Sequence, residues 1–176
     1  MHVLKSLAFS YDSLEDRILA AVNPGEANAW SCWLTRRLAL AMVQQTQQFL
    51  DRTSPAAQHT TPEFRSEVIA FERDAAIANT AKAMRRASAD VIQPGAATAE
   101  RADRVTIGGR GAGKFQIELH GVKGGSAAGI VARADLQRLL KMLQDEIDKA
   151  RWMTVPTAPS ATAGRETTAP PLRPRH

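Results

Sequence analysis

The sequence has one cysteine, few aromatic residues and no long apolar run. Cys32 cannot form an internal disulfide, which agrees with a reducing compartment. The apolar run from Leu38 to Val43 is too short to cross a bilayer, and the N-terminus lacks the basic and apolar segments of a signal peptide. With only five Phe, three Trp and one Tyr, alanine supplies much of the 44% apolar content. These features predict a soluble, cytoplasmic protein with closely packed helices and no membrane partner.

Motifs for metals and cofactors are also lacking. The four histidines have no metal-binding spacing: His2, His59, His120 and His176. The segment Gly108–Lys114 reads Gly-Gly-Arg-Gly-Ala-Gly-Lys, which matches the first part of a phosphate-binding loop. However, Phe115 stands where a Ser or Thr should hold magnesium, and the residues that follow alternate as in a strand. We therefore predict no metal and no cofactor, and a hairpin turn at these glycines.

Two further patterns are compatible with a catalytic site. His120 and Glu118 lie two residues apart on the polar side of a predicted strand, as a base and its orienting carboxylate would. Cys32 lies near the start of a predicted helix, where the helix dipole would lower the pKa of its thiol. Ordinary surface polarity and a structural cysteine explain these patterns better, so we predict no catalytic residue.

The net charge of +5 gives weak support for a polyanionic partner. Three arginines against one glutamate follow Met153, and without that segment the charge falls to +3. The same segment is rich in Pro, Ala and Thr and has one large apolar side chain, Leu172. We predict a disordered tail over residues 154–176, after a single α+β domain over residues 1–153.

The N-terminal half predicts a β-hairpin followed by two helices. Residues Val3–Tyr11 and Arg17–Val22 alternate as strands, and Asn23-Pro24-Gly25 ends the second one. The first helix is expected over Ala29–Arg52, with Asn28 as its N-cap. A second helix is expected to begin after Thr61-Pro62-Glu63 and to end near Arg86. The two helices should form an antiparallel hairpin.

The second helix carries apolar residues on two sides. One seam alternates in steps of four and three and should pack against the first helix: Phe64, Val68, Phe71, Ala75 and Ala78. The other stripe lies roughly opposite and should be covered by the sheet or by another molecule: Ile69, Ala76, Ile77 and Met84.

The C-terminal half predicts antiparallel strands and a helix after a loop over Ser88–Asp103. The strands are Arg104–Ile107, Lys114–His120 and Ala127–Ala132. An amphipathic helix follows over Arg133–Trp152. The fold class is therefore α+β, and the pattern leaves open whether the two groups of strands share one sheet.

Arg37 falls inside the apolar arc of the first predicted helix, where a buried charge needs a partner. The acidic residues just before that helix are suitable partners: Glu15, Asp16 and Glu26. An anionic ligand is the alternative.

Two functions follow from these patterns. The first is a small non-catalytic protein-interaction or assembly subunit, whose partner is another protein or a second copy of itself. Its candidate interface residues are Gln44, Gln45, Gln48, Ile69, Ile77, Met84 and Trp152. The alternative is nucleic-acid binding through a dispersed arginine stripe. The candidate contacts for an anion or a nucleic acid are Arg37, Arg85, Arg86, Arg110 and Lys114.

Overall fold

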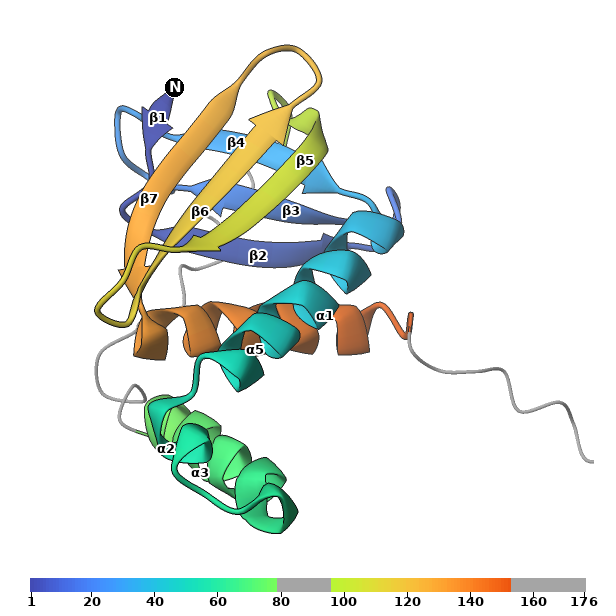
Figure 1. The fold of residues 1–176 in the computed structure, drawn as a ribbon. Helices are drawn as coiled ribbons and strands as arrows, with labels where there is room; N and C mark the ends of the chain where they lie inside the picture. Colours follow the sequence, from blue (N-terminus) through green and yellow to red (C-terminus); the bar gives the residue numbers. More distant parts are fainter. Residues whose placement is uncertain (79–95, 153–176) are drawn as a thin grey trace, which may run out of the picture.

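The computed structural model describes residues 1–78 and 96–152 and has a mixed α+β fold (Figure 1). Its strands are β1 (His2–Val3), β2 (Leu7–Asp12), β3 (Arg17–Val22), β4 (Trp30–Leu34), β5 (Glu100–Gly109), β6 (Lys114–Gly121) and β7 (Ser126–Ala132). Its helices are α1 (Arg36–Arg52), α2 (Pro55–Gln58), the 3-10 turn η1 (Pro62–Phe64), α3 (Arg65–Ala78) and α5 (Arg133–Lys149). Within the described ranges, no helix is both long and apolar enough to span a membrane.

All seven strands belong to one sheet, in the order β1-β7-β6-β5-β4-β3-β2. Strands β2 and β3 pair antiparallel from Leu7 with Val22 to Asp12 with Arg17, and β4 continues this meander. Strands β5, β6 and β7 form a second antiparallel meander. A short parallel pairing joins the two, with Cys32 of β4 opposite Glu100 of β5. The two groups of strands therefore share one sheet.

The sheet curls so that its two ends come together through the N-terminal residues. Strand β1 pairs parallel with β7, and the chain then passes directly into β2 at the opposite edge. The amide of Leu4 continues the pairing by donating to Ala128 O at 2.8 Å. A Cβ atom on Gly129 would lie 2.4 Å from Leu4 O, so this close approach requires a glycine. Figure 1 shows the β5–β7 meander in front of β2–β4.

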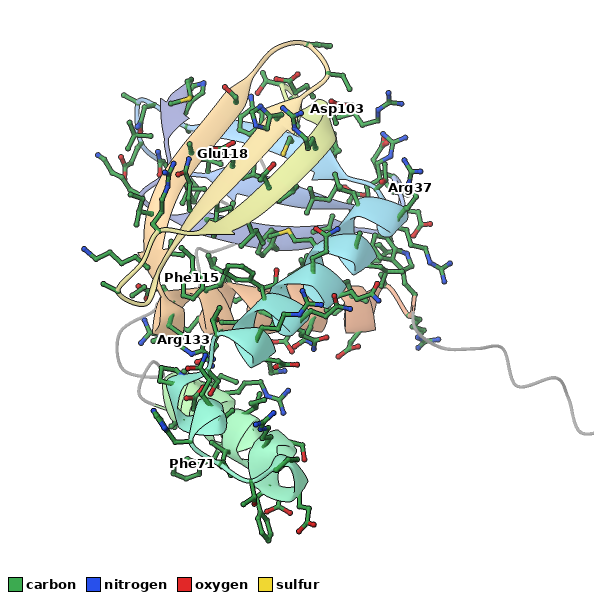
Figure 2. All side chains as sticks on the ribbon, viewed as in Figure 1. Arg37, Phe71, Asp103, Phe115, Glu118 and Arg133 are labelled. Atoms are coloured by element: carbon green, nitrogen blue, oxygen red, sulfur yellow. The ribbon has the colours of Figure 1, made fainter. Side chains whose placement is uncertain are left out.

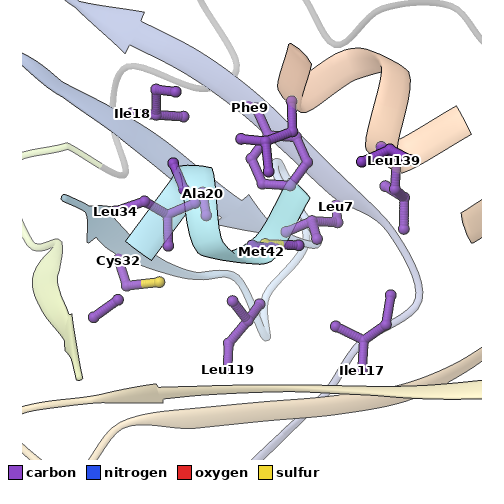
Figure 3. Close-up of a cluster of buried hydrophobic side chains, with 14 of the residues drawn as sticks. Leu7, Phe9, Ile18, Ala20, Cys32, Leu34, Met42, Ile117, Leu119 and Leu139 are labelled. Atoms are coloured by element: carbon purple, nitrogen blue, oxygen red, sulfur yellow. The ribbon is translucent and has the colours of Figure 1, made fainter. Parts of the chain in front are cut away.

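Each three-stranded meander is followed by a helix of 17 residues, α1 after β4 and α5 after β7. These two helices pack against each other and cover the same open side of the curled sheet (Figure 1). The main core lies between them and the inner face of the sheet (Figure 3). Large, fully buried side chains of this core come from both meanders and from α5, and the fully buried Ala39 comes from α1; the large ones include Ile18, Val22, Cys32, Leu34, Ile117, Leu119 and Leu143.

The first helix begins later than the sequence predicted. Residues Trp30–Leu34 form β4, and α1 begins at Arg36 with Thr35 as its N-cap instead of Asn28. Thr35 Oγ1 accepts a hydrogen bond of 3.3 Å from the amide of Leu38. Cys32 and Leu34 alternate along the strand, and the sheet buries both side chains completely. This burial favours the strand over a helix turn at these residues.

This shift also changes the position of Arg37. It lies in the first turn of α1 and is exposed, so the prediction of a buried charge was wrong (Figure 2). Asp16, one of its expected partners, instead accepts hydrogen bonds from Trp152 and Tyr11.

The second helix also differs from the prediction. A short helix, α2, begins after Ser54, and α3 packs against α2 and α5. Phe64 and Phe71 of the predicted packing seam are 54% and 75% exposed, whereas Ala76 of the opposite stripe is buried and Ile69 and Ile77 are half-buried. The predicted stripe therefore faces the interior more than the two phenylalanines of the predicted seam do, while Val68 and Ala75 of the seam are half-buried. Residues 55–78, the α2–α3 arm, extend away from the sheet in Figure 1.

The C-terminal elements match the predicted order, with strand β5 extending over part of the predicted loop. The segment Arg110–Gly113 is a hairpin turn between β5 and β6, with positive φ at Gly111, Ala112 and Gly113. The glycine-rich segment thus leads into a strand and lacks the helix of a phosphate-binding loop. The predicted tail and three of the predicted site residues, Met84, Arg85 and Arg86, lie outside the described residues.

Candidate interaction surface

A groove with a volume of about 630 Å³ lies between α1 and α5. Its walls combine apolar and polar side chains: Leu40, Val43, Gln44 and Gln47 from α1, and Lys141, Gln144, Ile147 and Asp148 from α5. Gln44 and Asp148 are exposed, so the groove is open to solvent. It is therefore accessible to a partner without any rearrangement of the core.

Helix periodicity explains why these side chains share a surface. The four residues of α1 are spaced at i, i+3, i+4 and i+7, which places them along one side of the helix. The neighbouring side of α1 carries Ala39, Met42 and Leu50, which are buried in the core. The groove residues therefore form a second stripe, whose apolar members Leu40 and Val43 also pack against the core and whose glutamines line the outer edge.

The predicted glutamines are exposed on the distal half of α1. Gln44 lines the groove, whereas Gln45 and Gln48 are exposed outside its lining. Thr46, between them, is buried and donates a hydrogen bond of 2.6 Å to Met42 O. The polar character that the sequence indicated for this half of the helix therefore belongs to its outer side, while its inner side remains in the core.

Charges of both signs lie along the α5 wall of the groove. Lys141 pairs with Asp145 one turn further along α5. Asp148 lies two turns beyond Lys141 and is exposed. The wall thus has a cation near one end and an anion near the other.

The α2–α3 arm carries a second exposed apolar surface. Phe71 points away from the sheet at the outer side of the arm in Figure 2. Phe64, in the 3-10 turn η1 that leads into α3, is also exposed. The residues Ile69 and Ile77, which were predicted to meet a partner, face the interior of the molecule more than this seam does.

An arginine that the sequence did not single out holds the arm in place. Arg133, at the start of α5, pairs with Glu72 of α3 at 3.0 Å and also donates to Leu50 O at 2.8 Å and Thr53 Oγ1 at 3.1 Å. Glu72 accepts a further hydrogen bond from the buried Ser54. Three helices therefore meet at one half-buried guanidinium (Figure 2).

Trp152, also predicted as an interface residue, makes its contacts inside the molecule. It is 5% exposed, and its indole Nε1 donates to Asp16 Oδ1 at 2.8 Å. Its ring meets Tyr11 edge-on, with 5.9 Å between ring centroids. Trp152 therefore anchors the end of α5 to the β2–β3 hairpin.

The three predicted basic residues that the structure describes do not form one patch. Arg37 lies at the start of α1, and Arg110 and Lys114 lie at the β5–β6 turn, on the other side of the molecule in Figure 1. Arg110 is hydrogen-bonded to Gln116, which in turn is hydrogen-bonded to Glu118. A negative charge thus lies among the cations of this face. Nucleic-acid binding stays a prediction, and the described residues give it little support.

The polar face of β6 and its neighbours is an ordinary network of surface contacts. His120 Nε2 lies 3.4 Å from Glu118 Oε2, and both side chains are about one-third exposed. A small hollow of about 200 Å³ adjoins them, lined by Thr106, Gly108, Gly109, Arg110, Gln116 and Glu118. Glu118 is engaged by two neighbours, so it does not act as the dedicated partner of His120.

Cys32 and Glu100 form a buried structural group at the junction of the two meanders. Burial, with a smaller effect of the Glu100 charge, raises the pKa of Cys32 to about 12. The expected lowering by a helix dipole was wrong because Cys32 lies within a strand. Glu100 accepts hydrogen bonds from Trp30 Nε1 at 3.1 Å and from the amide of Lys123. Cβ atoms on Gly121 or Gly125 would collide with its carboxylate.

Across residues 1–78 and 96–152, no group of three or more His, Cys, Asp or Glu side chains is arranged to hold a metal ion. Comparison of the chain with protein-family models, curated proteins and solved structures found no match. The described residues present two candidate binding surfaces: a solvent-open groove with an apolar and amide lining, and an exposed apolar seam on the arm.

Proposed function

We propose that this protein is a non-catalytic interaction or assembly subunit that binds a protein partner in the α1–α5 groove. The observation that carries the proposal is the lining of the groove, in which Leu40, Val43 and Ile147 are flanked by glutamines and charges. Apolar area bordered by hydrogen-bonding side chains is typical of the surfaces that bind proteins.

The groove suits an elongated partner, such as a helix. Two packed helices form the walls of the groove, and a third helix can place apolar side chains between them. The amides of Gln44, Gln47 and Gln144 can each donate and accept hydrogen bonds at the rim. Binding would then fix the register of the partner through the amides while the apolar side chains supply most of the free energy.

The exposed polar members of the groove lining contribute little to the fold. Leu40, Val43 and Ile147 also pack in or against the core, whereas Gln44 and Asp148 are exposed to solvent. The exposed members of the lining are therefore available for binding at small cost to stability.

A photo-cross-linking side chain at position 44 of the full chain tests the proposal in the cells that produce it. We expect a cross-linked protein adduct from position 44 and none from position 106, an exposed matched control on the outer face of β5. Absence of an adduct from position 44, or the same adduct from both positions, would contradict the assignment of the groove.

A further inference from the structure

We infer that the occupant of the groove is a second copy of this chain, with the two α5 helices antiparallel about a two-fold axis near Gln144. This inference rests on the proposed function and names the partner of that same groove. It is carried by the self-complementary charges of the α5 wall and by the position of the amide between them.

A two-fold interface requires that a surface complement itself, and the α5 wall does so. Lys141 and Asp148 are seven residues apart and both line the groove, so about two helix turns separate them along one side. When a second α5 lies antiparallel against the first, Lys141 of each copy faces Asp148 of the other. The two-fold axis therefore generates two Lys141–Asp148 pairs, one on each side of the axis.

The midpoint between these charges falls at Gln144, which lines the same wall. An amide side chain near a two-fold axis meets its own symmetry copy. Glutamine carries both a donor and an acceptor, so the two amides can satisfy each other, which a charged residue at this position could not do.

Helix α1 adds apolar contact beside this pair. Its groove residues span Leu40 to Gln47, with their midpoint between Val43 and Gln44. In the same antiparallel arrangement, Leu40 and Val43 of each copy add apolar area beside the α5 pair, and the amides and charges add polar contacts.

The size of the face predicts a weak dimer. Each of the two 17-residue helices is about 25 Å long and about 10 Å across, so together they present on the order of 500 Å² per subunit. A standard stable interface buries about 800 Å² per partner. In addition, Lys141 already pairs with Asp145 in a single chain, which reduces the gain from a new partner. We therefore expect a concentration-dependent, roughly micromolar equilibrium.

The exposed seam of α3 fits a second copy less well. In an antiparallel pair of α3 helices centred near Phe71, the exposed Glu67 and Asp74 of one copy would approach the same acidic residues of the other. Like charges beside such a seam oppose association. An antiparallel pair therefore brings opposite charges together on α5 but like charges together on α3, and this difference favours α5 as the interface.

Charge exchange across the interface provides the test. Lys141→Glu and Asp148→Lys are made separately in the full chain, and association of each is measured by analytical ultracentrifugation over a concentration series. Each variant alone places two like-charge pairs in the dimer, so its Kd should rise by at least roughly tenfold. An equimolar mixture of the two should recover wild-type association, because opposite charges again face each other in both pairs.

Lys149→Glu makes the same charge change on the same helix at an exposed residue outside the groove lining, so it should leave the Kd unchanged. Thermal unfolding of each variant shows that loss of association is not loss of folding.

Three results would overturn the inference: a wild-type chain that remains monomeric throughout the series, a mixture that does not recover, or a dimer that is insensitive to both exchanges. A dimer lost on Phe71→Ser alone would place the interface on α3. A monomeric chain that still forms adducts from position 44 in cells would leave the proposed function standing with a different partner.

Discussion

The indole of Trp152 donates a hydrogen bond of 2.8 Å to the carboxylate of Asp16, linking the residues after α5 to the β2–β3 turn. The hydroxyl of Tyr11 donates to the same oxygen at 3.0 Å. These two donors, first Trp152 and then Tyr11, lower the pKa of Asp16, and the Arg36 guanidinium adds a smaller effect in the same direction. Arg36 also donates to the carbonyl of Trp152, so three segments converge on this corner.

This corner predicts an acid-dependent loss of stability. The ionised form of Asp16 is favoured in the folded chain, so its contribution is present above the ordinary carboxyl pKa and is lost as the pH falls through the lowered value. Asp16→Asn should make the free energy of unfolding less dependent on pH below about 4. Urea unfolding between pH 2 and 6, with Glu63→Gln as an exposed control, measures this change. Equal slopes for Asp16→Asn and the wild type would contradict it.

Arg133→Met should loosen the α2–α3 arm without unfolding the sheet. The substitution leaves Glu72, the Leu50 carbonyl and the Thr53 hydroxyl without their shared partner, at a cost of about 1–3 kcal/mol. Hydrogen exchange should therefore rise over residues 55–78 and change little in β6. Arg138→Met, on the same helix, is the control because its partner Asp135 lies within α5. Uniform acceleration over the whole chain would show that the arm is not a separate unit.

Gly129→Ala should detach β1 from β7. The new Cβ would meet the carbonyl oxygen of Leu4 at 2.4 Å, and a backbone atom cannot turn aside as a side-chain end can. We expect destabilisation of about 1–3 kcal/mol and faster exchange at the Leu4 amide. Gly108→Ala is the matched control, since its Cβ would meet nothing within 4 Å. A similar loss in both variants would point to strand propensity as the cause instead of this contact.

Cys32 should be unreactive in the folded protein and should make the fold sensitive to alkali. Its thiol is buried and its pKa is raised to about 12, so the folded state disfavours the thiolate. The corresponding stability is present below the ordinary thiol pKa of about 8.5 and is lost progressively as the pH rises toward the folded value. Iodoacetamide labelling at pH 8 should require urea, and Cys32→Ala should flatten the decline in stability above pH 9. Rapid labelling of the native chain would contradict this burial.

The sequence predicted those elements whose patterns are local. Strand β6 alternates between Phe115, Ile117 and Leu119 on one side and polar residues on the other, and the structure buries these three side chains. The α5 stripe from Leu136 to Ile147 is buried in the same way. Both elements pack one face against the core, so the spacing of their apolar residues along the sequence identifies the residues that are buried.

The sequence-based prediction misplaced the boundary between β4 and α1 because the apolar residues there fit both the spacing of a helix and the alternation of a strand. Trp30, Trp33 and Leu34 lie at helical spacing, but Trp30, Cys32 and Leu34 also alternate, and the second pattern is the one that the sheet uses. Thr35 was the available signal, since it caps the helix that follows. The error placed Arg37 in a buried arc and Cys32 at a helix end, so one wrong boundary produced both mistakes.

The groove and the Arg133 network could not be read from the sequence. Gln44 and Lys141 share a surface only because α1 and α5 cross the same side of the sheet, and nothing local encodes that juxtaposition. Arg133 likewise contacts residues that lie 61 to 83 positions away. The exposed glutamines of α1 could be identified as a polar surface, but their companions on α5 required the fold.

The parallel pairing of β1 with β7 affects the order in which the sheet can fold during synthesis on the ribosome. His2 pairs with Ala127, so β1 has no partner until β7, the last strand of the described sheet, has been synthesised. At ordinary elongation rates this interval lasts on the order of 10 s. The β2–β4 meander can form during that time, whereas closure of the sheet must wait for the second meander. The residues of β1 are therefore exposed to chaperones and proteases for longer than those of the β2–β4 meander, and slow translation of β5–β7 would prolong that exposure.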